Sequence, residues 1–194
     1  PFPGPFLLFT NRMVSASSDY TVRFFQVWGT CMGFQFLSLL TAQDDGILCE
    51  KCFDSEGMPL PLDFEEPATT NSRLFGGLGS LKHPLATENL TENSHHDGIS
   101  PSTFVTNTAL ADFYTVLSTD KDGTGAPFVS TMEAKKYPIY GVQWHPEKNN
   151  FEWTLKLGPN AIPHSANAVK VSQYMANFLV GESRQSSHSF PTKE

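Results

Sequence analysis

The chain is built around residues 27–40, which read VWGTCMGFQFLSLL. The apolar run 23–28 predicts a β-strand, and Gly29 predicts the turn that follows it. Beyond the turn, apolar residues recur at the spacing of an amphipathic helix that packs on a sheet. Cys31 stands at the junction of strand and helix, where a sharp bend holds a side chain at the carboxyl edge of a parallel sheet. The stretch therefore predicts an α/β fold that presents a cysteine at this edge.

The position of Cys31 suits a nucleophile. The helix that follows points its N-terminal N–H groups at the sulfur, and these groups favour a thiolate and can stabilise an oxyanion. Gly29 and Gly33 let helix, strand and substrate approach without a Cβ clash. An isolated cysteine at the start of a core helix is more often buried and inert. The Gly-x-Cys-x-Gly pattern after an apolar strand nevertheless favours the catalytic interpretation.

Composition indicates one globular domain spanning residues 1–194, with 1–20 as an atypical or remnant segment and 185–194 as a flexible tail. Hydrophobic residues make up 39% and charged residues 17%, which argues against a disordered chain. The net charge of −7 argues against nucleic acid or an anionic membrane as the main partner. No apolar run approaches the length that crosses a bilayer. Because the chain begins at Pro1 without a visible signal peptide, we expect a removed leader or a fragment.

Two cysteines lie in an irregular stretch, residues 47–80, that shows no clear period. Cys49 and Cys52 form a C-x-x-C pair without a second pair or nearby histidines, so a structural zinc site is not expected. A redox dithiol or a local disulfide stays open, and two unpaired thiols are the preferred interpretation. The triplet that starts at Asn89 is an acceptor for N-glycosylation if the chain enters the secretory pathway.

The second half of the chain predicts a hairpin, a buried strand and a last helix. Residues 113–118 and 128–133 are strand-like, and an Asp- and Gly-rich turn joins them. Residues 137–143 predict a buried strand. Ser165 predicts the N-cap of a helix with an apolar face. From Glu182 onward the polar sequence predicts a frayed tail.

A histidine and a glutamate follow the strand predicted at 137–143. The imidazole of His145 could accept the proton of Cys31 or form an ion pair with it. The carboxylate of Glu147, on a turn that Pro146 restricts, could hold the ring in the right tautomer. Alone, this pair would be interpreted as exposed loop residues. With the cysteine it predicts a catalytic set, because open α/β sheets build their sites at the carboxyl ends of parallel strands.

Two adjacent histidines occur in the polar stretch HHDGISP, residues 95–101. A solvated loop is the simplest interpretation of such a stretch. Adjacent side chains in extended backbone point to opposite sides, so at most one of His95 and His96 faces any one site.

Together these stretches resemble folate γ-glutamyl hydrolase, a family of the class I glutamine amidotransferase-like fold. The resemblance runs from about residue 18 to residue 184, and its continuation beyond the His-Pro-Glu motif singles out the hydrolase within the superfamily. It implies an α/β fold with a three-layer, open, mostly parallel sheet flanked by helices, as in flavodoxin. Whether the N-terminal strands of that fold are all present stays open. The matching stretches are WGTCMGF (28–34), HHDGISP (95–101), YPIYGVQWHPEK (137–148), NNFEW (149–153) and IPHS (162–165).

The resemblance implies a cysteine peptidase that hydrolyses the γ-glutamyl bonds of poly-γ-glutamyl folates. Cys31 is then the nucleophile that forms a γ-glutamyl thioester, and His145, oriented by Glu147, is the general base and acid. No metal or other cofactor is implied, and neither nucleic acid nor a membrane is an expected partner. The resemblance also implies a lysosomal, vacuolar or secreted enzyme that is often a homodimer.

Further positions concern the oxyanion and the substrate. The backbone N–H of Met32 is expected to supply one oxyanion donor, and Gly4 marks the remnant of an oxyanion loop. His95 matches a histidine near the active site of the family. The proline after Gly4 lacks an N–H where the family has glycine, and Gln35 stands where the family usually has glutamate. Two alternatives therefore stay open: a glutaminase-type amidotransferase domain and a truncated, non-catalytic relative.

Overall fold

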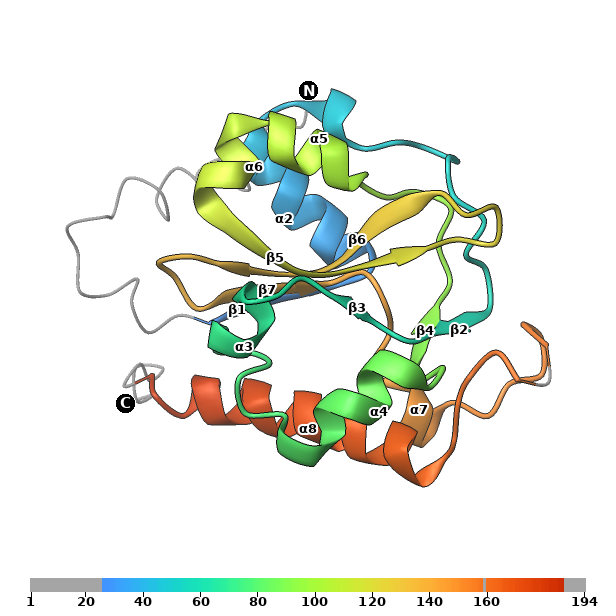
Figure 1. Cartoon of the computed structure of the whole chain (residues 1–194). Coiled ribbons are helices and arrows are strands. Elements are labelled where there is room, and N and C mark those ends of the chain that lie inside the picture. The colour runs from blue at the N-terminus through green and yellow to red at the C-terminus, as the bar shows by residue number, and fades with distance from the viewer. Residues whose placement is uncertain (1–25, 159, 187–194) are drawn as a thin grey trace, which may run out of the picture.

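The structure is a computed structural model that describes residues 26–158 and 160–186. Gly4, the expected N-terminal remnant 1–20 and residues 187–194 of the expected tail lie outside the described residues. In chain order, and with the labels of Figure 1, the elements are β1 (Val27–Thr30), α2 (Met32–Ala42), η2 (Asp45–Ile47), β2 (Met58–Leu60), β3 (Asp63–Phe64), α3 (Ala68–Asn71), η3 (Gly79–Leu81), α4 (Lys82–Thr87), β4 (Thr91–Asn93), α5 (Pro101–Thr106), α6 (Thr108–Phe113), β5 (Tyr114–Lys121), β6 (Pro127–Ala134), β7 (Ile139–Val142), α7 (Lys148–Phe151) and α8 (Ala166–Ser183).

The main sheet is mixed. Within the described residues its strand order is β1-β7-β6-β5-β3, with β1 parallel to β7 and the other neighbours antiparallel. Strands β2 and β4 form a separate antiparallel pair. The α/β class is confirmed, whereas a mostly parallel sheet is not what the described residues form. The reason is the length of the connections: residues 122–126 and 135–138 are too short for the crossover that parallel neighbours need.

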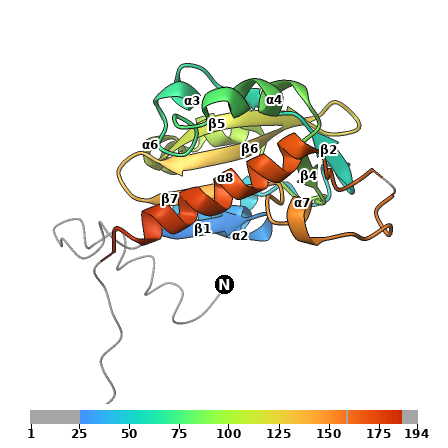
Figure 2. The same cartoon turned by 90° about the horizontal axis from the view of Figure 1, so that it is seen from below.

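Helices cover both faces of this sheet, as the three-layer expectation requires. Figure 1 shows α2, α5 and α6 over one face and α3, α4 and α8 over the other, and Figure 2 shows α8 running across β7 and β6. Each interface holds its own apolar cluster. Trp144 and Val171 belong to the cluster on the α8 side, and Phe34, Leu110 and Met132 belong to the cluster on the α2 side. Burial of both clusters stabilises the sheet from two sides.

The last helix begins and ends where its side chains find partners. The Oγ of Ser165 accepts a hydrogen bond from the N–H of Ala168 at 3.2 Å, which is the expected N-cap. The helix continues through Ser183, so Glu182 lies within it and the frayed tail expected from that residue onward is wrong at this point. The hydroxyl of Tyr140 donates to Glu182 Oε2 at 2.6 Å. This contact with strand β7 gives the last turn of the helix a tertiary anchor.

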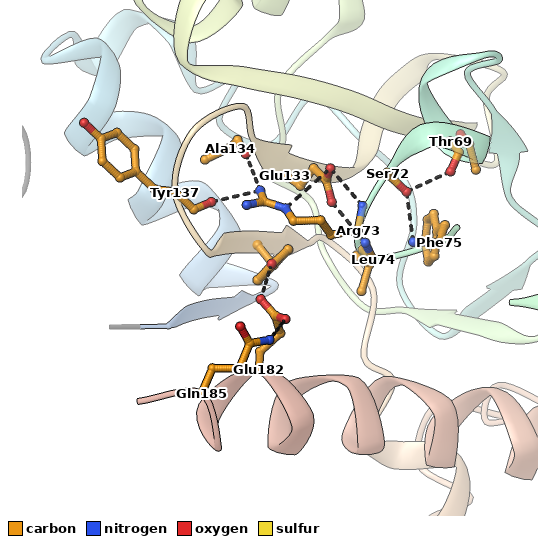
Figure 3. A network of polar contacts seen from close by, with 11 residues as sticks. Thr69, Ser72, Arg73, Leu74, Phe75, Glu133, Ala134, Tyr137, Glu182 and Gln185 are labelled. Carbon is orange, nitrogen blue, oxygen red and sulfur yellow. Dashed lines mark hydrogen bonds and ion pairs between the residues drawn. The ribbon is translucent and has the colours of Figure 1, made fainter. Parts of the chain in front are cut away.

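A buried carboxylate ties the loop after α3 to strand β6. Glu133 is only 8% exposed, and its two oxygens accept hydrogen bonds from the backbone N–H groups of Arg73 at 3.2 Å and Leu74 at 3.1 Å. Figure 3 shows Arg73 turned back over Glu133 toward the carbonyls of Ala134 and Tyr137, to which its guanidinium donates. The Nε of Arg73 lies 3.9 Å from Glu133 Oε1. The carboxylate of Glu133 thus provides acceptors for two N–H groups of a loop, which have no partner in a β-sheet.

We predict that Glu133→Gln destabilises the protein by about 2 kcal/mol, because an amide accepts on only one of its two atoms and leaves a buried N–H without a partner. Urea unfolding measures the change in the free energy of unfolding. Glu50→Gln, on an exposed side chain, is the matched control and should leave that free energy within about 0.5 kcal/mol of the wild type. Equal stability of both variants would contradict the role given to Glu133.

Candidate active site

Cys31 occupies a strained bend between β1 and α2. Its backbone adopts φ 52° and ψ −107°, a left-handed conformation that a residue with a side chain rarely takes and that costs on the order of 1–3 kcal/mol. Two backbone bonds hold the bend: the N–H of Cys31 donates to Val142 at 2.8 Å, and its carbonyl accepts from Gln35 at 3.1 Å. The half-buried side chain carries a free thiol. The structure therefore places the cysteine at the strand–helix junction, as the sequence predicts. The turn expected at Gly29 is wrong, because Gly29 lies within β1 and the bend is at Cys31; residues 23–25 of the expected strand lie outside the described residues.

The two glycines beside Cys31 serve different purposes. A Cβ at Gly29 would lie 2.6 Å from the backbone carbonyl of Gly33, so only glycine lets the strand approach the first turn of α2 this closely. A Cβ at Gly33 would meet nothing within 4 Å. The expected close packing of strand and helix is thus confirmed for Gly29. A side chain at position 33 would therefore meet no other atom.

His145 and Glu147 form the second part of the site, on the turn that follows β7. The Nδ1 of His145 lies 2.7 Å from Glu147 Oε1. Since a carboxylate accepts, Nδ1 carries a hydrogen and donates it, and Nε2 is left for another partner. The side chain of Cys31 lies close enough to His145 to raise the pKa of the imidazole. The structure therefore brings the three residues predicted for catalysis together.

The charge state of this set follows from its contacts. Burial disfavours a charged imidazole, but the close approach of Cys31 and the hydrogen bond to Glu147, together with the charges of those two groups, raise the pKa of His145 to about 9. Burial raises the pKa of the Glu147 carboxyl, but the hydrogen bond from His145, a backbone hydrogen bond and the charges of His145 and Lys148 together outweigh burial and lower that pKa below its ordinary value. At neutral pH the site holds an imidazolium beside a carboxylate.

Two glutamines also lie near the sulfur of Cys31. The Nε2 of Gln143 lies 3.6 Å from Cys31 Sγ and donates to it. The Nε2 of Gln35 donates to Gln143 Oε1 at 3.3 Å and to the carbonyl of Asp97 at 2.9 Å. The resemblance singled out Gln35, but sequence reasoning did not identify Gln143. The available signal was a polar residue at the end of an otherwise apolar strand, two positions before His145.

His95 lies beside this site as a buried, neutral ring. Burial lowers the pKa of His95 to about 4, and Phe128 packs edge-on against the imidazole with the ring centroids 4.7 Å apart. Its Nδ1 donates to the carbonyl of Asp97 at 2.9 Å. The Nε2 is buried and has no hydrogen-bond partner among the described residues. His96 donates instead to the carbonyl of Phe53 at 3.0 Å, which agrees with the expectation that at most one histidine of the pair faces the site.

A disulfide holds the loop that carries these histidines. Cys49 and Cys52 are bonded to each other, so the preferred interpretation of two unpaired thiols is wrong. The bonded turn lies against the histidine loop: Cys49 forms a bridge with Gly98, and the N–H of Lys51 donates to Asp97 Oδ1 at 2.7 Å. This packing brings the two sulfurs within bonding distance, and spacing alone could not show it.

The positions expected to stabilise the oxyanion are only partly described. Met32 is the first residue of α2, so its backbone N–H has no acceptor within the helix and stays available beside Cys31. Its side chain is exposed. Gly4, the other expected contributor, lies outside the described residues.

Among residues 26–158 and 160–186, no helix is long and apolar enough to span a bilayer.

Comparison with known proteins places this geometry in a family. Residues 3–157 match the profile of glutamine amidotransferase class-I. A gamma-glutamyl hydrolase from Mus musculus is 46% identical over 167 residues, which cover 86% of this chain and 50% of the relative. Gamma-glutamyl hydrolase B from Dictyostelium discoideum is 39% identical over 93% of this chain and 50% of its own length. The corresponding human protein is 42% identical over 96% of this chain and 56% of its own length. The chain therefore spans about half the length of the curated relatives it matches.

We predict opposite effects for alanine at the two glycines of the bend. Gly29→Ala should lower the free energy of unfolding by about 3 kcal/mol, because its Cβ meets backbone that cannot move aside. Gly33→Ala should raise it by up to about 1 kcal/mol, because the space is open and alanine favours a helix. Urea unfolding of both variants and the wild type measures the two changes in the free energy of unfolding. Equal destabilisation by the two substitutions would show that the close approach at Gly29 is not the constraint.

We also predict a pH-dependent contribution of His145 to stability. Its pKa in the folded protein, about 9, lies above the ordinary 6.5 of an unfolded chain, so the stabilisation is complete below about pH 6.5 and is lost as the pH rises through about 9. Relative to His145→Gln, the wild type should lose on the order of 3 kcal/mol across this window. Unfolding free energies measured from pH 6 to pH 10 test this, with the exposed His83→Gln as the control that should track the wild type. A difference between wild type and His145→Gln that stays constant with pH would contradict the assignment.

Proposed function

This chain belongs to the class-I glutamine amidotransferase family, and from its site we propose that it is a cysteine peptidase that hydrolyses γ-glutamyl bonds. The observation that carries the proposal is the meeting of Cys31, His145 and Glu147 at the carboxyl ends of the parallel strands β1 and β7. The names of the relatives that this chain resembles support the γ-glutamyl bond as the one that is cleaved.

Acylation begins with the sulfur of Cys31. The thiolate attacks the carbonyl carbon of the γ-amide and forms a C–S bond, while the carbonyl oxygen becomes an oxyanion beside the N–H of Met32. The imidazolium of His145 then gives its Nε2 proton to the amide nitrogen, and the C–N bond breaks. The amine leaves, and a γ-glutamyl thioester on Cys31 remains. Glu147 holds Nδ1–H throughout, so that Nε2 is the atom that exchanges the proton.

Deacylation uses the same groups in reverse. His145, now neutral, takes a proton from water at Nε2, and the hydroxide attacks the thioester carbon. The C–S bond breaks, the thiolate returns beside the imidazolium, and the product leaves as a carboxylic acid that gives its proton to the solvent. The enzyme ends in its starting charge state, so the cycle requires no metal or other cofactor.

We propose poly-γ-glutamyl folates as the substrates, on the resemblance to the folate hydrolase family. The chemistry of the site supports a polar, amide-containing chain. Gln143 donates to the sulfur of Cys31, and Gln35 donates to Gln143, so amide groups surround the position where the γ-amide would react. The glutaminase alternative has support in the family to which the chain belongs, so the test below includes glutamine.

We propose a lysosomal, vacuolar or secreted location. Two observations support it. Disulfides persist in oxidising compartments, and Cys49 is bonded to Cys52. Asn89, the acceptor of the glycosylation triplet, is exposed between α4 and β4. We propose a homodimer on the family resemblance alone, and light scattering of the purified protein measures it.

We predict that the chain shortens folate tetra-γ-glutamate and that Cys31→Ala lowers the rate at least about a thousandfold, because the thioester can no longer form. Separation of the products by chromatography measures turnover. A thermal melt of the variant, which loses only the sulfur, checks that it is folded.

The other outcomes separate the alternatives. Release of ammonia from glutamine without cleavage of the folate would support a glutaminase. A folded wild type without turnover of either substrate would support a non-catalytic relative. A Cys31→Ala variant that retains full activity would overturn the thiol mechanism.

A further inference from the structure

One residue of strand β4 contacts both ends of the turn that carries the catalytic histidine. The carbonyl of Glu92 accepts a hydrogen bond from the N–H of His145 at 2.8 Å. The carboxylate of Glu92 lies 3.2 Å from the Nζ of Lys148, measured to Oε2. Glu92 therefore reaches the first residue of the turn 145–148 through its backbone and the last through its side chain.

This ion pair is almost completely removed from water. The side chain of Glu92 is 0% exposed and that of Lys148 is 14% exposed. The hydroxyl of Ser94 donates to Glu92 Oε1, whereas Oε2 receives no directed hydrogen bond from any described residue and faces only the ammonium group. A buried charge is costly unless it is paired, so each partner depends on the other to stay in place.

Further bonds fix the turn on the same side. The N–H of Lys148 donates to the carbonyl of His145 at 3.4 Å and closes the turn. The next residue, Asn149, donates from Nδ2 to the carbonyl of Leu90 at 2.9 Å. The turn 145–148 thus rests on the segment around β4, whereas its working side faces Cys31.

We propose that Glu92 and Lys148 are positioning residues, whose ion pair holds the turn 145–148 so that His145 stays against Cys31 and Glu147. The inference rests on the hydrolase activity proposed above. Neither residue touches the reacting atoms in this arrangement. Glu92 acts through the backbone of the turn, and Lys148 acts through the same turn and through its charge beside Glu147.

The physical argument for positioning is that a buried ion pair adds little net stability. The cost of removing two charges from water offsets most of their attraction, so apolar partners of similar size usually stabilise a fold as well or better. What the pair supplies is a defined geometry, because neither charge can move without leaving the other unpaired. A misplacement of about 1 Å in a catalytic group can cost on the order of a hundredfold in rate.

The test compares Lys148→Met and Glu92→Gln with the double variant that carries both substitutions. Each single variant leaves one buried charge unpaired, so both should melt at a lower temperature and show a lower kcat. In the double variant no buried charge is left, so the melting temperature should return toward that of the wild type. Its kcat should stay on the order of tenfold or more below the wild type, with KM for folate tetra-γ-glutamate changed less, because the turn is no longer held.

Two further variants control this experiment. Lys148→Arg keeps the charge and should retain most of the wild-type kcat. Lys82→Met breaks the exposed pair with Glu66, whose side chains are 36% and 43% exposed, and should leave kcat unchanged. A double variant that regains both the melting temperature and kcat would overturn the proposal, because the pair would then serve the fold alone.

A second readout does not need a substrate. The rate at which iodoacetamide alkylates Cys31 depends on the imidazolium beside the sulfur, so it should fall several-fold in the double variant and hold in Lys148→Arg. If the wild type does not cleave the folate, the proposed function fails. The alkylation rate still tests whether the ion pair of Glu92 and Lys148 positions His145. Equal alkylation rates in the wild type and the double variant would overturn the positioning role whatever the substrate.

Discussion

The parallel pairing of β1 with β7 is the constraint on which the site depends. In this register Gly29 lies opposite Gly141 and Thr30 opposite Val142, so both strands end at the same edge of the sheet. The chain leaves one strand through a cysteine and the other through the turn of His145, and the two side chains meet across one strand spacing. A slip of one residue would turn every following side chain to the opposite face and separate them.

The paired glycines Gly29 and Gly141 also set how closely helix α2 approaches the sheet. A Cβ at Gly29 would meet the backbone of Gly33, and a Cβ at Gly141 would lie 2.9 Å from the ring of Phe34 and 2.8 Å from the end of Met132. Helix and sheet therefore approach closely enough to bury Phe34 completely beneath the bend. The free energy gained by this packing opposes the backbone strain at Cys31. The same close approach therefore buries the core and holds the half-buried thiol at its bend.

A second layer of residues surrounds the sulfur and the imidazole. Strand β4 contributes Glu92 next to the turn 145–148, and the loop that follows brings His95 and the carbonyl of Asp97 to the site. The disulfide-bonded turn packs against that loop, and Gln35 links it to the neighbourhood of the sulfur. Backbone and side-chain hydrogen bonds of the described residues thus fix each proposed catalytic group, as a preorganised site requires.

Local pattern was enough to predict the strand–cysteine–helix bend, the hairpin of β5 and β6, the capped helix α8 and the pairing of His145 with Glu147, because each depends on residues close together in the chain. Short connections make the described sheet mixed, although the expected fold was mostly parallel. Sequence by itself determined which residues could do the chemistry. Only the tertiary structure decided which of them meet: Gln143 reaches Cys31 across 112 positions, Cys49 bonds to Cys52 against a distant loop, and Glu92 pairs with Lys148. Such contacts depend on strand register and on packing between remote segments, and no local pattern encodes either.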